Sequence, residues 1–257
     1  MQPDEVINAL DQPQLLDVVF YPRKEVRQDV AGAEDFEIPV SDGAVLGARW
    51  YKRDSSWPTL LYFHGNGETV SDHDHMAPWY HDLGLNLFVS DYRGYGWSTG
   101  RPSFRALIDD TKRVADFFLE RLDDGAPTPL LMGRSLGSSP ACSLALERGA
   151  GFRGLILESG FSNVVALLNL FGIRFSAGEE QISELLSNHL KLRRIELPVL
   201  LLHGELDRLI RPDAARENHA NIAHDKKTLC ILEGVGHNDI LLKRTEYFRA
   251  IREFVGP

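Results

Sequence analysis

The sequence has few cysteines, no long apolar run and no excess of positive charge, and each shortage excludes a class of protein. Two cysteines in 257 residues are too few for a disulfide framework or a cysteine-based zinc site. The longest apolar stretch, residues 164–171, is interrupted by Asn169 and is much shorter than the roughly 20 residues that cross a bilayer. Lys and Arg number 28 against 37 Asp and Glu, a net charge of −9 that repels phosphate backbones and anionic lipid. We therefore expect no nucleic-acid partner.

The start of the chain lacks the features of a secretory leader. Residues 1–5 contain no basic stretch followed by an apolar core. We therefore expect the mature chain to begin here and the protein to be cytoplasmic. Apolar residues make up 43% and charged residues 25% of the chain, which is typical of an ordinary globular protein. Without internal repeats or linkers, the sequence predicts a single domain over residues 1–257.

Short apolar runs alternate with helix-length amphipathic segments along most of the chain. This alternation predicts an α/β fold, in which a mostly parallel sheet is covered by helices on both faces. The first two runs flank the turn sequence Ser41-Asp42-Gly43, so the sheet is expected to begin with an antiparallel hairpin. The resulting eight strands are expected at residues 36–40, 45–52, 59–64, 86–91, 129–134, 154–158, 199–203 and 228–232. Helices are expected at residues 70–83, 104–122, 136–148, 214–222 and 239–254.

One connection is longer than a single crossover helix requires. Residues 161–195 contain two further amphipathic stretches, 164–171 and 181–192, joined around residues 176–179. A segment of this length between two strands is a place for a small cap or a pocket wall. Its apolar side chains could line an acyl pocket or pack against the sheet; they are Leu167, Leu168, Leu170, Phe171 and Phe175.

The most specific motif is Gly133-Arg134-Ser135-Leu136-Gly137, which follows a predicted strand and precedes a predicted helix. In this arrangement a tight turn exposes the serine hydroxyl at the end of the sheet, and small residues on either side make room for the strained backbone. By itself the pattern is equally compatible with a serine that caps a helix. Its position between strand and helix favours a nucleophile.

A serine nucleophile needs a base, and the base needs an orienting carboxylate. Asp207 follows one predicted strand and His237 follows the next. Because the carboxyl ends of parallel strands meet at one edge of a sheet, we expect Ser135, Asp207 and His237 to lie together. Glu205 is an alternative carboxylate, and His237 could instead be an ordinary surface histidine.

The oxyanion of an acyl-transfer intermediate needs backbone N–H donors. Leu136 follows the nucleophile and is the first candidate. Asn66, in the loop after the strand at 59–64, is the second, because Gly65 and Gly67 allow close approach of the main chain. The same glycines could open a phosphate-binding loop, but Val70 occupies the position where a dinucleotide fingerprint has its third glycine.

Together these motifs resemble the α/β-hydrolase superfamily, in the branch of small serine hydrolases with a minimal cap, Bem46-like or depalmitoylase-like. The motifs that carry the resemblance are Phe-His-Gly-Asn at 63–66, Asp-Tyr-Arg-Gly-Tyr-Gly at 91–96, Gly-Arg-Ser-Leu-Gly at 133–137, His-Gly-Glu-Leu-Asp at 203–207 and Gly-His at 236–237. They occur in the family's order from about residue 36 onward. The resemblance implies an α/β-hydrolase fold, with Ser135 as nucleophile, His237 as base and Asp207 as its partner. It also implies that the N–H groups of Asn66 and Leu136 form the oxyanion hole.

The sequence thus predicts a serine hydrolase that cleaves small-molecule esters or thioesters through an acyl-enzyme intermediate, with no metal or cofactor. A serine peptidase, an amidase or an acyltransferase would use the same residues, because the fold does not fix the reaction. A non-catalytic binding module on this scaffold is a further alternative. The run Asp72-His73-Asp74-His75 does not suggest a metal site, since consecutive residues on a helix point in different directions.

Overall fold

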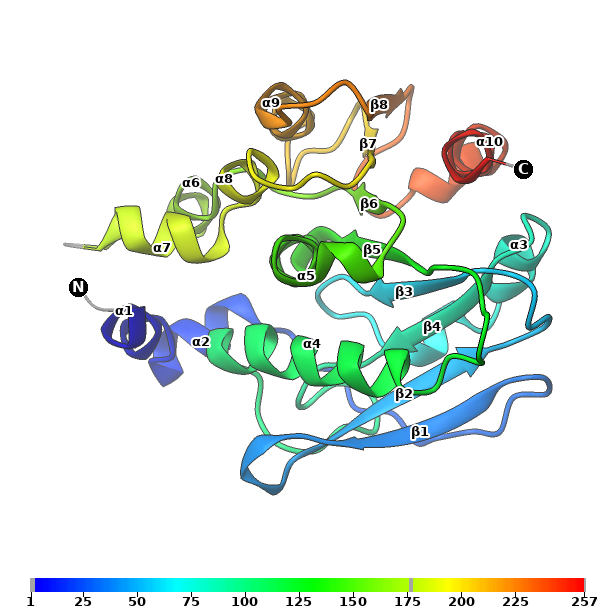
Figure 1. Cartoon of the computed structure of the whole chain (residues 1–257). Helices are drawn as coiled ribbons and strands as arrows, with labels where there is room; N and C mark the ends of the chain where they lie inside the picture. Colours follow the sequence, from blue (N-terminus) through cyan, green and yellow to red (C-terminus); the bar gives the residue numbers. More distant parts are fainter. Residues whose placement is uncertain (1–2, 176–177, 257) are drawn as a thin grey trace. The chain divides into compact units, whose positions relative to one another are not determined.

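The computed structural model describes residues 3–175 and 178–256 (Figure 1). The chain divides into two compact units, Met1–Pro129 and Leu130–Pro257, and each unit contains four strands. All the strands predicted from the sequence are present, with ends displaced by at most two residues. The prediction of a single domain with a cap at about 161–195 stays a prediction.

The first unit is built on a mixed sheet. Strand β1 (Glu34–Pro39) pairs antiparallel with β2 (Val45–Tyr51), as the turn sequence predicted. Strand β2 pairs antiparallel with β4 (Asn86–Ser90), which is parallel to β3 (Thr59–Phe63). Its helices are α1 (Pro3–Leu10), α2 (Pro13–Val19), α3 (Ala77–His81) and α4 (Phe104–Leu119), with 3-10 turns η1 (Ser41–Gly43) and η2 (Val70–His73).

An aromatic layer joins α4 to this sheet. Phe36, Trp50 and Phe88 project from three neighbouring strands toward the helix. The rings of Phe117 and Phe118 on α4 meet them with centroids 5.1–5.9 Å apart. Such pairs contribute about 0.5–1.5 kcal/mol each beyond the burial of their area. The period of 3.6 residues in α4 therefore determines which face of the helix covers the sheet.

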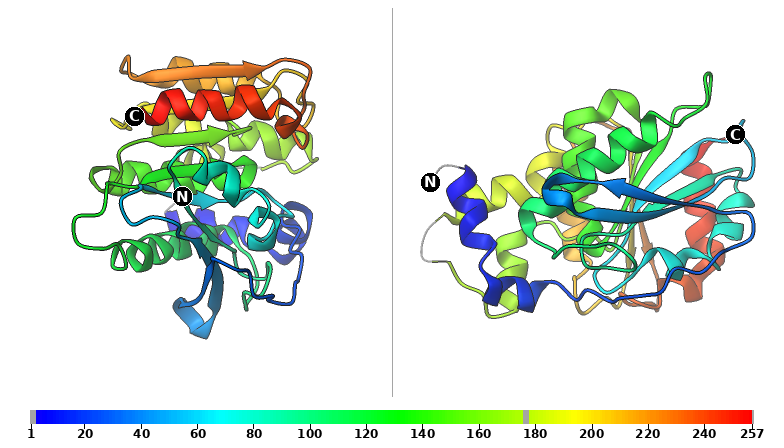
Figure 2. Two further views of the ribbon diagram at one scale, coloured as in Figure 1. Left: turned by 90° about the vertical axis from the view of Figure 1, so that its right-hand side faces the viewer. Right: turned by 90° about the horizontal axis from the view of Figure 1, so that it is seen from below.

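The second unit is a parallel sheet in the order β5 (Leu130–Arg134), β6 (Leu155–Glu158), β7 (Val199–Gly204) and β8 (Lys227–Leu232). Strands β5, β6 and β7 consist entirely of buried residues, as expected for parallel strands with both faces covered. Helix α9 (Asp213–Asn221) and helix α10 (Arg244–Val255) both contact β7 and β8, and Figures 1 and 2 show them on opposite faces. The carboxyl ends of the four strands therefore open at one edge.

The remaining helices of this unit lie in the connections between and after these strands. Short turn η3 (Ser135–Gly137) leads directly into α5 (Ser138–Arg148), and η4 (Gly149–Gly151) follows it. The connection from β6 to β7 contains α6 (Val164–Leu170), α7 (Glu179–Leu186) and α8 (Asn188–Leu192). The turn η5 (Ile240–Lys243) precedes α10. Residues 176 and 177, in the predicted joint of the connection, lie outside the described residues.

Two predicted helices are wrong in extent. The segment 70–83 forms η2 and then α3, with a break between them, and Pro78 lies in the first turn of α3, where a proline is tolerated. The stretch 181–192 is interrupted at Ser187, whose extended backbone separates α7 from α8. The hydroxyl of Ser187 accepts a hydrogen bond from the N–H of Val164, so a contact with α6 replaces the continued helix. Helices α1 and α2 have no counterpart among the predictions.

Candidate functional site

Ser135 lies at a strained turn between β5 and α5. Its φ angle is +50°, a region that side chains other than glycine rarely adopt. A Cβ atom at Gly133 would lie 2.3 Å from the carbonyl oxygen of Gly137 and 2.7 Å from the Cβ of Ala141. The hydroxyl of Ser138 donates to the carbonyl of Ser135 at 2.6 Å. The turn is thus closed tightly around Ser135, as the strand-turn-helix motif predicted.

His237 bridges Ser135 and Asp207. Its Nε2 lies 3.0 Å from the Oγ of Ser135, and its Nδ1 lies 2.7 Å from Oδ2 of Asp207. All three residues are at least nine-tenths buried, with exposed fractions of 7% for Ser135, 9% for His237 and 3% for Asp207. The second unit therefore brings together the three side chains that the sequence singled out.

The Asp207 carboxylate is held by four donors. Its Oδ1 accepts from the N–H groups of Leu209 and Ile210 at 2.9 and 2.8 Å. Its Oδ2 accepts from His237, and the Nε2 of the buried His203 lies 3.3 Å away. Burial alone would raise the pKa of Asp207, but the hydrogen bonds from His203 and His237 and the backbone N–H of Ile210 lower it overall. The carboxylate therefore stays ionised next to the imidazole at neutral pH.

The alternative carboxylate, Glu205, has a different partner. It is exposed, and its Oε2 accepts from the N–H of Gly234 at 3.1 Å. This contact stabilises the loop before His237. In the structure the imidazole of His237 therefore contacts Asp207, whereas Glu205 contacts Gly234.

Close packing of the loops after β7 and β8 brings His237 toward Asp207 and Ser135. The N–H of Leu206 donates to the carbonyl of Val235 at 2.8 Å. A Cβ atom on Gly204, at the end of β7, would lie 2.5 Å from that carbonyl oxygen and 2.6 Å from that of Gly236. Glycine at 204 is thus required for the loops after β7 and β8 to pack this closely.

The two expected oxyanion donors, Leu136 and Asn66, belong to different units. Leu136 is the second residue of η3 and directly follows Ser135. Asn66 belongs to the first unit, where its Oδ1 accepts from the hydroxyl of Tyr95 at 2.6 Å and from the N–H of Tyr21 at 3.0 Å. Its Nδ2 donates to the carbonyl of Val19 at 2.6 Å. The side chain of Asn66 thus fixes its own loop, and the role of its N–H stays a prediction.

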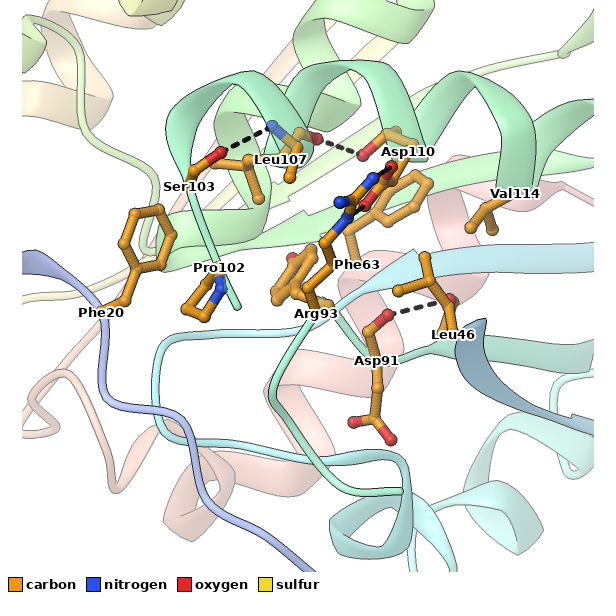
Figure 3. Close-up of a pocket in the computed structure, with 14 residues that line it drawn as sticks. Phe20, Leu46, Phe63, Asp91, Arg93, Pro102, Ser103, Leu107, Asp110 and Val114 are labelled. Atoms are coloured by element: carbon orange, nitrogen blue, oxygen red, sulfur yellow. Dashed lines mark hydrogen bonds and ion pairs between the residues drawn. The ribbon is translucent and has the colours of Figure 1, made fainter. Parts of the chain in front are cut away.

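A small cavity in the first unit is shown in Figure 3. Its volume of about 10 Å³ leaves room for one water molecule. Asp110 on α4 forms a two-point ion pair with Arg93, at 2.7 Å to Nε and 2.9 Å to Nη2 (Figure 3). The cavity is too small for a substrate, and two of its polar side chains, Arg93 and Asp110, are paired with each other.

A larger, open hollow of about 450 Å³ adjoins the Asp207 loop. It is lined by Glu205, Leu206, Asp207, Arg208, Arg211, Pro212 and Asp213. Its lining combines apolar surface with charges of both signs.

Within the described residues, no group of three or more His, Cys, Asp or Glu side chains could hold a metal ion. None of the described helices combines the length and apolarity needed to cross a bilayer.

Three site residues escaped the sequence analysis as individuals: Arg134, Glu158 and His203. Arg134 and Glu158 end two buried strands and are direct partners in the β5–β6 register. Opposite charges at the ends of otherwise apolar strands are a signal that could have found them. His203 ends a similar apolar run, but its contact with Asp207 depends on the fold of the following loop.

Comparisons with known proteins place these features in context. The family model described as serine aminopeptidase, S33 (Hydrolase_4), matches residues 55–192. Protein bem46 of Schizosaccharomyces pombe is 31% identical over 206 residues, which cover 78% of this chain and 68% of that protein. Lysophosphatidylserine lipase ABHD12 of Danio rerio is 33% identical over 184 residues, which cover 63% of this chain and 47% of that protein. The solved structure of the esterase Pf2001 from Pyrococcus furiosus superposes with a TM-score of 0.72 at 18% identity, covering 91% of this chain and 97% of the esterase.

Proposed function

Since the chain belongs to the α/β-hydrolase superfamily, in its Bem46-like family, we propose that it is a serine hydrolase of carboxylic esters or thioesters. The observation that carries the proposal is the hydrogen-bonded chain Ser135–His237–Asp207, with distances of 3.0 and 2.7 Å. Candidate nucleophiles and bases are recognised by such geometry, with a third group orienting the base.

The reaction follows from the positions of the protons. His237 Nε2 accepts the proton of the Ser135 hydroxyl as the oxygen attacks the acyl carbon. Asp207 holds the proton on Nδ1 and stabilises the imidazolium that forms. The imidazolium then protonates the leaving alcohol or thiol, and the acyl group remains on Ser135. Water, activated by the same imidazole, releases the acid and regenerates the hydroxyl.

The oxyanion of each tetrahedral intermediate needs donors in place before the reaction. The first N–H groups of a helix have no partner within that helix, which favours the amide of Leu136 for this role. The second donor is the one predicted from the sequence, the N–H of Asn66. Gly65 N–H donates to Glu68 Oε2 at 2.8 Å, a contact that shapes the loop around Asn66.

The substrate class is supported by the relatives. ABHD12 of Danio rerio is named as a lipase, and the structural neighbour from Pyrococcus furiosus as an esterase. A small-molecule acyl ester or thioester is therefore the proposed partner.

A turnover series tests this proposal. We expect hydrolysis of p-nitrophenyl esters of increasing acyl length, and of matching acyl thioesters, by the wild type. Ser135→Ala and His237→Ala should each lower kcat by about 10³-fold or more, because each removes a member of the triad. Ester turnover that persists in both variants would exclude the proposed mechanism.

Amide hydrolysis is the second candidate, favoured by the serine aminopeptidase description of the matching family model. The same three side chains serve either reaction, with an amine as leaving group. Aminoacyl p-nitroanilides tested beside the esters decide between them. A higher kcat/KM for the anilides would replace the ester proposal with a peptidase. Absence of turnover and of covalent labelling at Ser135 would instead point to a binding module.

A further inference from the structure

Arg134 connects the strand that directly precedes Ser135 to the loop that carries His237. It is the last residue of β5 and is 9% exposed. Its Nη2 donates to the carbonyl oxygen of His237 at 2.8 Å and lies 3.1 Å from Oδ1 of Asn238. A single guanidinium thus contacts the main chain of the proposed base and the side chain that follows it.

The guanidinium is held by the buried Glu158, which is itself held by the buried Tyr247. Arg134 Nε donates to Oε1 of Glu158 at 2.9 Å, and Glu158 is 2% exposed. The other oxygen of that carboxylate accepts from the hydroxyl of Tyr247 on α10 at 2.7 Å. The Glu158 charge compensates the Arg134 charge, so the guanidinium is fixed without a net positive charge beside His237.

The loop that carries His237 has little regular structure of its own. It follows β8 with Gly234, whose φ is +73°, and with Gly236. Three main-chain groups of the loop before His237 are also bonded: the carbonyl of Val235 accepts from the N–H of Leu206, the N–H of Gly236 donates to Oδ1 of Asp239, and the N–H of Gly234 donates to Glu205. The bond from Arg134 fixes the peptide of His237 itself.

We propose that Arg134 is a positioning residue for acyl transfer. It binds the carbonyl oxygen of His237 and the side chain of Asn238, and so keeps the imidazole within hydrogen-bond distance of Ser135. This inference rests on the proposed function, in which Ser135 is the nucleophile and His237 the base. Displacements of about 1 Å in an active site can cost about 100-fold in rate, so a contact of this kind has kinetic consequences.

The requirement is for a guanidinium rather than for a positive charge. Arg134 bonds three acceptors in different directions through a rigid planar fork. A lysine at this position would keep the charge beside Glu158 but could not reach all three acceptors in a fixed geometry. Arg134→Lys therefore keeps the positive charge and removes the contacts that position His237.

The experiment measures the second-order rate constant for labelling of Ser135 by a fluorophosphonate, per folded molecule. Arg134→Lys should label about 10- to 100-fold more slowly than the wild type, and ester turnover should show the loss in kcat with little change in KM. A purely structural role would reduce the folded fraction and leave the rate per folded molecule unchanged. That result would overturn the proposal.

The matched control is Arg49→Lys. Arg49 is also buried, at 1% exposed, and bonds Asp35 at 2.5 and 2.8 Å and the carbonyl of Gln28 at 2.5 Å. All of these partners lie in the first unit. Its replacement perturbs a comparable buried ion pair and should leave the labelling rate per folded molecule within about twofold. A loss equal to that of Arg134→Lys would contradict a specific role for Arg134.

A second variant keeps the test decisive if the lysine variant folds poorly. Arg134→Gln combined with Glu158→Gln removes both buried charges, so neither is left without its counter-charge. The shorter amide at 134 should still fail to hold His237, and we expect the same slow labelling. A wild-type rate in the double variant would overturn the positioning role. Failure of the wild type to label would instead defeat the proposed function itself.

Discussion

Asp207 is the residue toward which two imidazoles converge. His237 contacts its Oδ2 at 2.7 Å and the buried His203 lies 3.3 Å from the same oxygen. The Nε2 of His203 is also 2.7 Å from the carbonyl oxygen of Ile210, so its proton is shared between two acceptors. His203 thus braces the loop that presents Asp207, while His237 has the direct contact. The two histidines have distinct roles at one carboxylate.

Replacement of Asp207 tests this assignment. We expect Asp207→Asn to lower kcat by about 10³-fold or more, because an amide cannot hold the required imidazole tautomer or stabilise the imidazolium. Glu205→Gln is the matched control, since it keeps an acceptor for Gly234 and does not touch His237. It should retain activity within about twofold. The opposite ranking of the two variants, measured as kcat on one ester, would transfer the role to Glu205.

At this scale the sequence predicted the residues whose chemistry has a recognisable pattern. Ser135 follows a strand and opens a helix, and Asp207 and His237 each follow an apolar strand, so parallel topology sufficed to place them together. The contact of Arg134 with His237 and that of His203 with Asp207 could not be predicted in the same way, because both depend on how loops fold after the strands end. Contacts of that kind are long-range and leave no local periodicity.

The turn from β5 to α5 is an element that tolerates no added volume. A Cβ atom at Gly133 would overlap with the carbonyl of Gly137 at 2.3 Å. We therefore expect Gly133→Ala to destabilise the fold by about 1–3 kcal/mol or more and to reduce Ser135 labelling. Urea unfolding and labelling of the soluble fraction measure the two effects.

Gly149→Ala is the control for this turn. The nearest side-chain atom to an added Cβ there is Leu197 Cγ, at 3.6 Å, an ordinary contact. Its unfolding free energy should therefore stay within about 0.5 kcal/mol of the wild type. Equal stabilities for the two variants would mean that the turn relaxes and that close packing does not hold Ser135.

Helices α5 and α8 enclose a buried lysine. Lys191 is 5% exposed, and its Nζ lies 3.3 Å from the hydroxyl of Ser139 and 3.4 Å from that residue's carbonyl oxygen. Burial lowers the pKa of Lys191 to about 8, although the negative charge of Glu147 acts in the opposite direction. The folded state thus binds this proton less tightly than the unfolded chain, whose lysines have a pKa of about 10.4.

The sign of this shift predicts a pH-dependent stability. Between about pH 8 and pH 10.4 the unfolded chain binds more protons at this position, so its contribution to stability rises with pH in that window. Lys191→Met, which fills similar space without a charge, should be more stable than the wild type by about 2–3 kcal/mol at pH 7 and by much less at pH 10. Urea unfolding at both pH values measures the difference.

The control for Lys191 is the exposed Lys226. Lys226→Met should change stability by only a few tenths of a kcal/mol at either pH, as is usual for surface positions. A difference between Lys191→Met and the wild type that is equal at pH 7 and pH 10 would contradict the account of Lys191.

Elements were predicted well where burial alone determines them. Strands β5, β6 and β7 are continuous apolar runs, and their bounds follow from the residues that interrupt those runs. Helices were predicted less well where tertiary contacts divide them. Asp74, between η2 and α3, accepts from Arg49 and from the hydroxyl of Tyr51, which lies on a neighbouring strand. No local pattern marks a break of that kind.

For the molecule as a whole, the order of the three proposed site residues along the chain agrees with the order used by the family. The second unit contains Ser135, Asp207 and His237 in the loops after β5, β7 and β8, in the chain order Ser, Asp, His. The α/β-hydrolase superfamily uses this order for its triad. The reaction is therefore proposed for the side chains of one unit alone.

The central claim is that His237 activates Ser135 for attack on an acyl group. Covalent labelling by a fluorophosphonate, read by intact mass and by peptide mapping, tests it most directly. We predict one adduct per chain, located on Ser135, formed rapidly in the wild type, very slowly in His237→Ala and not at all at this residue in Ser135→Ala. An unlabelled wild type, or an adduct on another residue that forms equally fast in all three proteins, would contradict the claim.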